Sequence, residues 1–237
     1  MNLPDGLVSP PIAHRGLWRP GEAPENSLAA FDIACRRHFG IELDVRLSAD
    51  GEAVVFHDER LERMTGGEAA VIDLRAEELA ATPLLGGPDR IPTLAQALTV
   101  IAGRVMLLVE IKAAQDGDGA LEARVAELLD RYEGPAAVIS FAPEALAWFA
   151  EHRPRRARGL DGLGLEDGPE RIAVFEAARE LALPHFLVLE KKSVLTPAAR
   201  AARASGTPVL AWTIRSPEEA GAVSEHCDNF IFEGFTA

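Results

Sequence analysis

Charged and imidazole side chains lie near the ends of several short apolar runs. His14 and Arg15 end the run IAHRG, and His57 follows the apolar part of AVVFHD. IELDV carries two carboxylates, and VMLLVEIK carries Glu110 and Lys112. Successive side chains of a strand point to opposite faces, so the polar pair of each of these last two runs shares one face. We therefore expect all seven groups to meet in one pocket.

The carboxylates of these runs, Glu42, Asp44 and Glu110, are typical of a metal site. Buried charges cost several kcal/mol per ion unless they are paired or bound to a metal. Oxygen ligands suit a hard divalent cation, Mg²⁺ or Ca²⁺, whereas zinc would favour histidines or cysteines. A structural ion pair between Glu110 and Lys112 is the alternative explanation for that pair.

The two histidines predict proton transfer, because imidazole titrates near neutral pH. One of His14 and His57 would take a proton from a nucleophile, and the other would give one to the leaving group. The sequence leaves their order open. Arg15 offers a planar fork for phosphate oxygens, and Lys112 a point charge. Together with a divalent ion, these groups indicate cleavage of a phosphodiester.

The elements that position these residues alternate between strands and helices, which predicts parallel strands with helical crossovers. The expected strands are residues 12–16, 41–45, 53–58, 105–112, 136–141, 156–160, 185–191, 209–214 and 229–235. The expected helices are residues 27–39, 93–102, 120–132, 143–151, 171–182, 197–204 and 217–226.

This pattern favours an α/β fold, a TIM-type (β/α)8 barrel, in which active sites form at the carboxyl ends of the strands. One of the nine strands is too many, and 156–160 and 229–235 are the weakest. An open doubly wound sheet is less favoured, because no glycine-rich phosphate motif follows the first strand. We expect one domain over residues 1–237, with a small insertion at about 59–91, helical near 76–81, as a lid or pocket wall.

The composition limits the partners and the location. The net charge of −13 disfavours binding to nucleic acid or to anionic membranes. No apolar run approaches the roughly 20 residues that span a bilayer. Residues 1–11 lack the features of a secretory signal, and the two cysteines are far apart, so we expect a cytoplasmic protein with free thiols. The basic run 152–158 fits a solvated loop or helix end. The sequence gives no indication of oligomeric state.

The chain resembles the glycerophosphodiester phosphodiesterase family, most of all in its first half. The resemblance covers His14 to about Ile214 and rests on the runs IAHRG, APENSLAAF, GIELDVRLSADGEAVVFHD, IPTL, LLVEIK, VISF and AWTI. It implies a barrel that hydrolyses small-molecule glycerophosphodiesters to glycerol 3-phosphate and an alcohol, within glycerol and lipid metabolism. It also implies that Glu42, Asp44 and Glu110 hold the metal, that His14 and His57 are the acid/base pair, and that Arg15 and Lys112 contact the phosphate.

Several points stay open within this resemblance. Asn26 either contacts the site or caps the following helix, and Trp212 is either a wall of the substrate pocket or a core residue. The segments WTIR (212–215) and NFIFEGF (229–235) depart from the family pattern, so the substrate is uncertain. A lysophospholipase D-like activity would use an apolar channel beside the pocket, lined by the insertion. A barrel that binds phosphodiesters without turnover is the non-enzymatic alternative.

Overall fold

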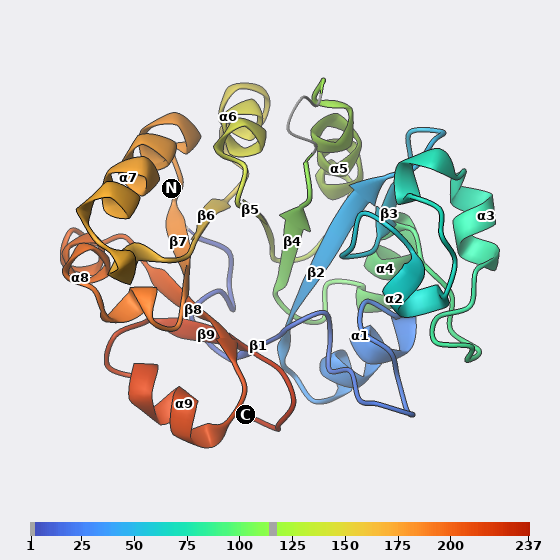
Figure 1. Cartoon of the computed structure of the whole chain (residues 1–237), viewed down its shortest axis with the longest axis horizontal. Coiled ribbons are helices and arrows are strands. Elements are labelled where there is room, and N and C mark those ends of the chain that lie inside the picture. The colour runs from blue at the N-terminus through green and yellow to red at the C-terminus, as the bar shows by residue number, and fades with distance from the viewer. Residues whose placement is uncertain (1–2, 114–117) are drawn as a thin grey trace.

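Parallel strands form a closed ring, as the computed structural model shows for residues 3–113 and 118–237 (Figure 1). Its eight strands are β1 (Ile12–Ala13), β2 (Gly40–Leu47), β4 (Leu107–Ile111), β5 (Ala136–Ser140), β6 (Arg158–Gly162), β7 (Phe186–Glu190), β8 (Val209–Ile214) and β9 (Asn229–Phe232). β1 closes the ring, because Ile12 pairs with Gly40 of β2 on one side and with Ile231 of β9 on the other. The predicted TIM-type barrel is confirmed, and an open sheet is excluded.

A ninth strand lies outside the ring. It is neither 156–160 nor 229–235, the two expected strands with the weakest sequence pattern. β3 (Ala53–Val55) runs antiparallel to the carboxyl-terminal part of β2, with Val55 opposite Val45. β6 and β9 both belong to the ring. The expectation was wrong because the ADG turn (49–51) joins β2 to β3 as a hairpin, and a connection this short cannot link parallel strands.

Helices surround the ring, as Figure 1 shows. They are α1 (Leu28–Arg36), α4 (Leu94–Ile101), α5 (Ala120–Asp130), α6 (Pro143–His152), α7 (Pro169–Ala182), α8 (Pro197–Ala204) and α9 (Pro217–Val223), with 3₁₀ turns at η2 (Leu165–Asp167) and η3 (Ser193–Leu195). Several begin at side-chain caps: Ser27 accepts from the Ala30 N–H, and Thr93 forms a capping box with Gln96. Their apolar faces pack against the outward side chains of the strands.

The segment between β3 and α4 folds against its own apolar cluster. It contains α2 (Glu62–Thr65), η1 (Val71–Asp73) and α3 (Ala76–Ala81). Met64, Val71, Leu79 and Leu84 are buried together there, which is why this long connection is ordered. It lies beside β2 and β3 at one edge of the ring (Figure 1).

The lower part of the barrel interior is filled by apolar side chains. Ile12, Leu108, Phe186, Leu210 and Ile231 belong to this cluster. The layer closes the amino-terminal end of the ring, so polar groups gather at the carboxyl ends of the strands. Within the described residues, no helix is both long and apolar enough to cross a bilayer.

Candidate active site

A pocket of about 210 Å³ opens at the carboxyl ends of the ring strands. Seven of the eight residues that the sequence singled out line it, and Asp44 lies buried beneath them. The pocket is lined by His14, Arg15, Glu42, His57, Glu110, Lys112, Ile139, Phe141, Asp161, Trp212, Thr213, Arg215 and Ile231.

The carboxylates of Glu42, Asp44 and Glu110 form a buried cluster. Each offers an oxygen atom, and these atoms lie within 4.8 Å of one another. Asp44 and Glu110 are direct partners in the parallel pairing of β2 with β4. Glu42 lies two residues before Asp44, on the same face of β2. The Oε1 atom of Glu42 is buried without a hydrogen-bond partner among the described residues.

The electrostatics of this cluster are those of a site for a cation. Burial and the neighbouring carboxylate of Asp44 raise the pKa of Glu42 well above its usual value and that of Glu110 to about 7. Burial also opposes ionisation of Asp44, but the charges of Lys112 and Arg15 hold its pKa below the usual range. Buried oxygen donors in excess of nearby cations fit a hard divalent ion, which would relieve their repulsion.

Two side-chain cations border the carboxylates. Lys112 Nζ lies 3.0 Å from Asp44 Oδ1 and 2.5 Å from Glu110 Oε1. Arg15 Nε lies 3.2 Å from Asp44 Oδ2, and the Arg15 backbone N–H donates to Glu42 Oε2 at 3.0 Å. Lys112 therefore takes part in the buried ion pair considered from the sequence, and it also lines the pocket, whereas its contact with phosphate stays a prediction.

The turn before α1 holds these groups in place. The Asn26 side chain donates to Asp44 Oδ2 at 2.7 Å, and Ser27, not Asn26, is the cap of α1. Of the two roles considered for Asn26, contact with the site is therefore the correct one. Glu25 accepts from Arg15 Nη1 at 2.7 Å and so restrains the guanidinium from its outer side.

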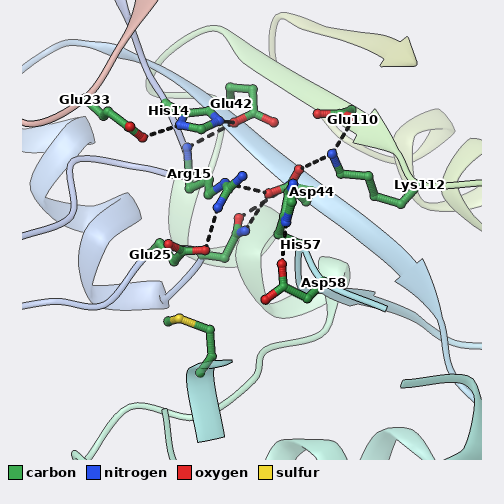
Figure 2. A network of polar contacts seen from close by, with 12 residues as sticks. His14, Arg15, Glu25, Glu42, Asp44, His57, Asp58, Glu110, Lys112 and Glu233 are labelled. Carbon is green, nitrogen blue, oxygen red and sulfur yellow. Dashed lines mark hydrogen bonds and ion pairs between the residues drawn. The ribbon is translucent and has the colours of Figure 1, made fainter. Parts of the chain in front are cut away.

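A carboxylate that the sequence analysis missed holds His14. Glu233 follows β9, and its Oε2 lies 2.5 Å from His14 Nδ1 (Figure 2). Its other oxygen accepts from Arg215 Nε at 2.8 Å. Burial opposes ionisation of Glu233, but the bond from His14 and the Arg215 charge lower its pKa to about 2. The two atypical segments, WTIR and NFIFEGF, thus contact each other.

His57 is held in a similar way from the other side of the pocket. Its Nδ1 lies 2.6 Å from Asp58 Oδ1, and Arg63 of α2 contacts the other Asp58 oxygen at 2.6 Å. Arg46 Nε donates to the His57 carbonyl at 2.8 Å. His57 does not end a parallel strand, as the sequence analysis assumed. It reaches the site because β3 folds back along β2, whose register places Phe56 beside Asp44.

Aromatic side chains form another wall of the pocket. Trp212 is half-buried, donates its Nε1–H to the Val188 carbonyl at 3.1 Å, and packs edge-to-face on Phe141 at 5.4 Å. Phe141 is 39% exposed. Trp212 also touches the apolar layer of the barrel interior, so it joins the core to the pocket wall.

Comparison with known proteins places this pocket in a family. The family model described as "Glycerophosphoryl diester phosphodiesterase family" matches residues 14–227. The chain belongs to this family. The matched range includes both histidines and all three clustered carboxylates, whereas Glu233 lies beyond it.

Individual relatives of this phosphodiesterase family agree in sequence and in fold. A glycerophosphodiester phosphodiesterase of Caldanaerobacter subterraneus is 43% identical over 109 residues, which cover 43% of this chain and 44% of the relative. A phosphodiesterase of Oleispira antarctica, solved in complex with its product sn-glycerol-3-phosphate, superimposes with a TM-score of 0.82 at 28% identity, over 94% of this chain and 91% of that one.

A glycerophosphodiester phosphodiesterase of Thermotoga maritima gives a TM-score of 0.75 at 26% identity, over 93% of this chain and 92% of that one. Matches to the curated relatives are shorter. This chain spans between 44% and 65% of the length of four of them.

Proposed function

We propose that this chain hydrolyses glycerophosphodiesters to glycerol 3-phosphate and an alcohol. The observation that carries the proposal is the arrangement of one pocket, in which His14 and His57, each held at Nδ1 by a carboxylate, border the Glu42–Asp44–Glu110 cluster. Membership of the phosphodiesterase family and the product bound to the Oleispira antarctica protein support the same reaction.

In this proposal Glu42, Asp44 and Glu110 hold a divalent ion, Mg²⁺ or Ca²⁺. When bound, the ion supplies positive charge to a phosphoryl oxygen. Arg15 and Lys112 add fixed charge beside it, since both line the pocket and are held by the buried carboxylates. The developing negative charge of the transition state is therefore met by groups that need no rearrangement.

The histidines carry the proton transfers. Because Nδ1 of each ring faces a carboxylate, the Nε2 atoms are the ones available for exchange with substrate. One histidine takes the proton of the attacking water or of a neighbouring substrate hydroxyl as the new P–O bond forms. The other gives a proton to the alcohol oxygen as the old P–O bond breaks. Burial lowers the pKa of His57, which favours its neutral form at neutral pH.

The test measures release of glycerol 3-phosphate from glycerophosphocholine and glycerophosphoethanolamine in EDTA, Mg²⁺ or Ca²⁺. We expect metal-dependent turnover by the wild type and a loss of about 10²-fold or more in His14→Ala and in His57→Ala, because each removes a proton-transfer group. His152→Ala, an exposed histidine on α6, is the matched control and should retain full activity. Tight metal binding without turnover of any diester would instead favour a binding protein.

Hydrolysis of lysolipids is a second candidate, because a mainly apolar hollow of about 400 Å³ lies beside the site. Its lining includes Trp18, Met64, Leu84 and Leu85, although Met64 and Leu84 are largely buried in the insertion. Glu25, which binds Arg15 of the catalytic pocket, also lines it. Turnover of lysophosphatidylcholine in the same assay would support this activity. The cytoplasmic location stays a prediction from the sequence.

A further inference from the structure

An acidic residue that the proposed reaction does not use lies inside the catalytic pocket. Asp161 is near the carboxyl end of β6, is only 5% exposed and lines the pocket. In the order of the ring, β4 and β5 separate β6 from β2, and β7, β8 and β9 separate it from β1. Asp161 therefore stands apart from the strands that carry the histidines and from the hairpin of β2 and β3.

The carboxyl of Asp161 is not satisfied by the protein. Its Oδ2 atom is buried, and none of the described residues gives it a hydrogen bond. No ion pair to Asp161 occurs within residues 3–113 and 118–237. Lys112, a cation of the same pocket, forms its ion pairs with Asp44 and Glu110. A buried polar group without a partner is costly, so a native structure keeps one where a ligand or water completes it.

The surroundings of Asp161 indicate the chemistry of that ligand. Ile139, Phe141 and Trp212 form the wall on its side of the pocket, which suits the carbon skeleton of a small alcohol. Burial and the negative charge of Glu110 raise the pKa of Asp161 well above its usual value. A carboxyl group accepts a hydrogen bond from a hydroxyl group in either protonation state, and the protonated form also donates one.

We propose that Asp161 binds the terminal hydroxyl group of the glycerol unit of the substrate, and that it selects for that hydroxyl. The inference rests on the proposed phosphodiesterase function. Space supports the glycerol end, because a pocket of about 210 Å³ admits a small polyol phosphate and leaves little room for a bulky group. An ammonium group of the head-group alcohol is the competing ligand, and the test separates the two.

The experiment compares glycerophosphocholine with 2-hydroxypropyl phosphocholine, which lacks the terminal glycerol hydroxyl. We expect the wild type to favour the glycerol substrate by about tenfold or more in kcat/KM, since a site built for a hydroxyl rejects the analogue without it. Asp161→Leu and Asp161→Ala should lose this preference by lowering kcat/KM for glycerophosphocholine only. Asp161→Asn, which still donates and accepts, should keep part of it.

Thermal unfolding of the same variants separates binding from a structural role. Asp161→Leu should unfold at the wild-type temperature or above, because it replaces an unpaired buried carboxyl by an apolar group of similar size. A lower unfolding temperature together with an equal loss on both diesters would show a structural role and overturn the proposal. If the leucine variant does not fold, Asp161→Ala carries the same comparison.

The remaining outcomes are also decisive. A wild type that turns over both diesters equally well would overturn the role of Asp161 and leave the phosphodiesterase function standing. A wild type that cleaves neither would overturn the function and this inference with it. A change in the ratio of glycerophosphocholine to glycerophosphoethanolamine turnover in Asp161→Asn, with the hydroxyl preference intact, would assign Asp161 to the head group instead.

Discussion

Each imidazole of the pocket has a carboxylate at its Nδ1 atom and a cation behind that carboxylate. His14 contacts Glu233, which contacts Arg215. His57 contacts Asp58, which contacts Arg63. The two chains of contacts come from different elements and share no residue. They fix the ring orientation of both histidines, which leaves Nε2 of each for the substrate.

At the residue scale we predict that Glu233→Gln lowers kcat by roughly tenfold or more with little change in KM. The amide keeps the shape of the side chain but cannot stabilise a positive charge on His14 during proton transfer. Glu233→Asp, which keeps the charge, should recover part of the loss. Steady-state kinetics on glycerophosphocholine measure both, with Glu127→Gln, an exposed carboxylate on α5, as the control. A rise in KM at constant kcat would contradict a positioning role.

The insertion contacts the residues that hold His57 and Arg15 through α2, a helix of four residues. Arg63 of α2 contacts Asp58, the partner of His57, and also Glu25, the partner of Arg15, at 2.7 Å. Met64 of α2 packs in the hydrophobic cluster of the insertion and anchors the helix. The side chain of Arg63 is therefore held in a defined position. This element therefore restrains both His57, the proposed proton-transfer group, and Arg15, the proposed phosphate contact.

At the element scale we predict that Arg63→Met lowers kcat/KM about three- to tenfold and changes the free energy of unfolding by less than about 1 kcal/mol. The small effect on stability is expected because its ion pairs are partly exposed. Arg60→Met is the matched control, since Arg60 is an exposed arginine of the same insertion that pairs with Glu62. Kinetics and chemical denaturation of both variants measure the difference. Equal activities of the two variants would show that α2 does not position the site.

The sequence pattern predicted the alternating strands and helices, and it predicted which side chains share one face of a strand. α8 and α3 have the predicted bounds, and the carboxylate cluster follows from the alternation of side chains along β2 and β4. Asp161 was missed because Arg158–Gly162 has two glycines and one apolar residue, so its strand has no periodic pattern.

Glu233 was missed for a different reason. It belongs to a loop after β9, and its contact with His14 depends on ring closure, which no local pattern reports. His57 was placed in the site for the wrong reason, because the antiparallel direction of β3 depends on the hairpin turn and not on the apolar run.

The whole molecule is acidic, with a net charge of −13, yet its proposed substrate is an anion. The basic run 152–158 does not offset this, since Arg153 lies 2.6 Å from Asp130 and Arg158 is buried. Attraction for a phosphodiester should therefore be local, with Arg15, Lys112 and the ion that the carboxylates would hold as its proposed sources. Occupancy of this centre should govern both stability and substrate binding.

At the scale of the whole molecule we predict that a divalent ion stabilises the protein more at pH 8 than at pH 6. The pKa of Glu110 is raised to about 7, so without metal its contribution to stability is present at low pH and is lost as the pH rises through 7. Below pH 7 the ion must also displace the proton of the Glu110 carboxyl. This requirement weakens the affinity of the protein for the ion about tenfold at pH 6.

Thermal unfolding of EDTA-treated protein, with and without Mg²⁺ or Ca²⁺ at both pH values, measures this effect. Glu110→Gln should reduce both the stabilisation and its dependence on pH. An equal rise in unfolding temperature at pH 6 and pH 8 would contradict the prediction.

Closure of the ring by β1 and β9 also makes the site depend on a contact that is distant in sequence. His14 and Glu233 are 219 residues apart, and they meet only when the first strand of the ring pairs with the last. During synthesis the ribosome adds Glu233 219 residues after His14. Recovery of activity after denaturation would therefore report the pairing of β1 with β9, and formation of the helices alone would not restore it.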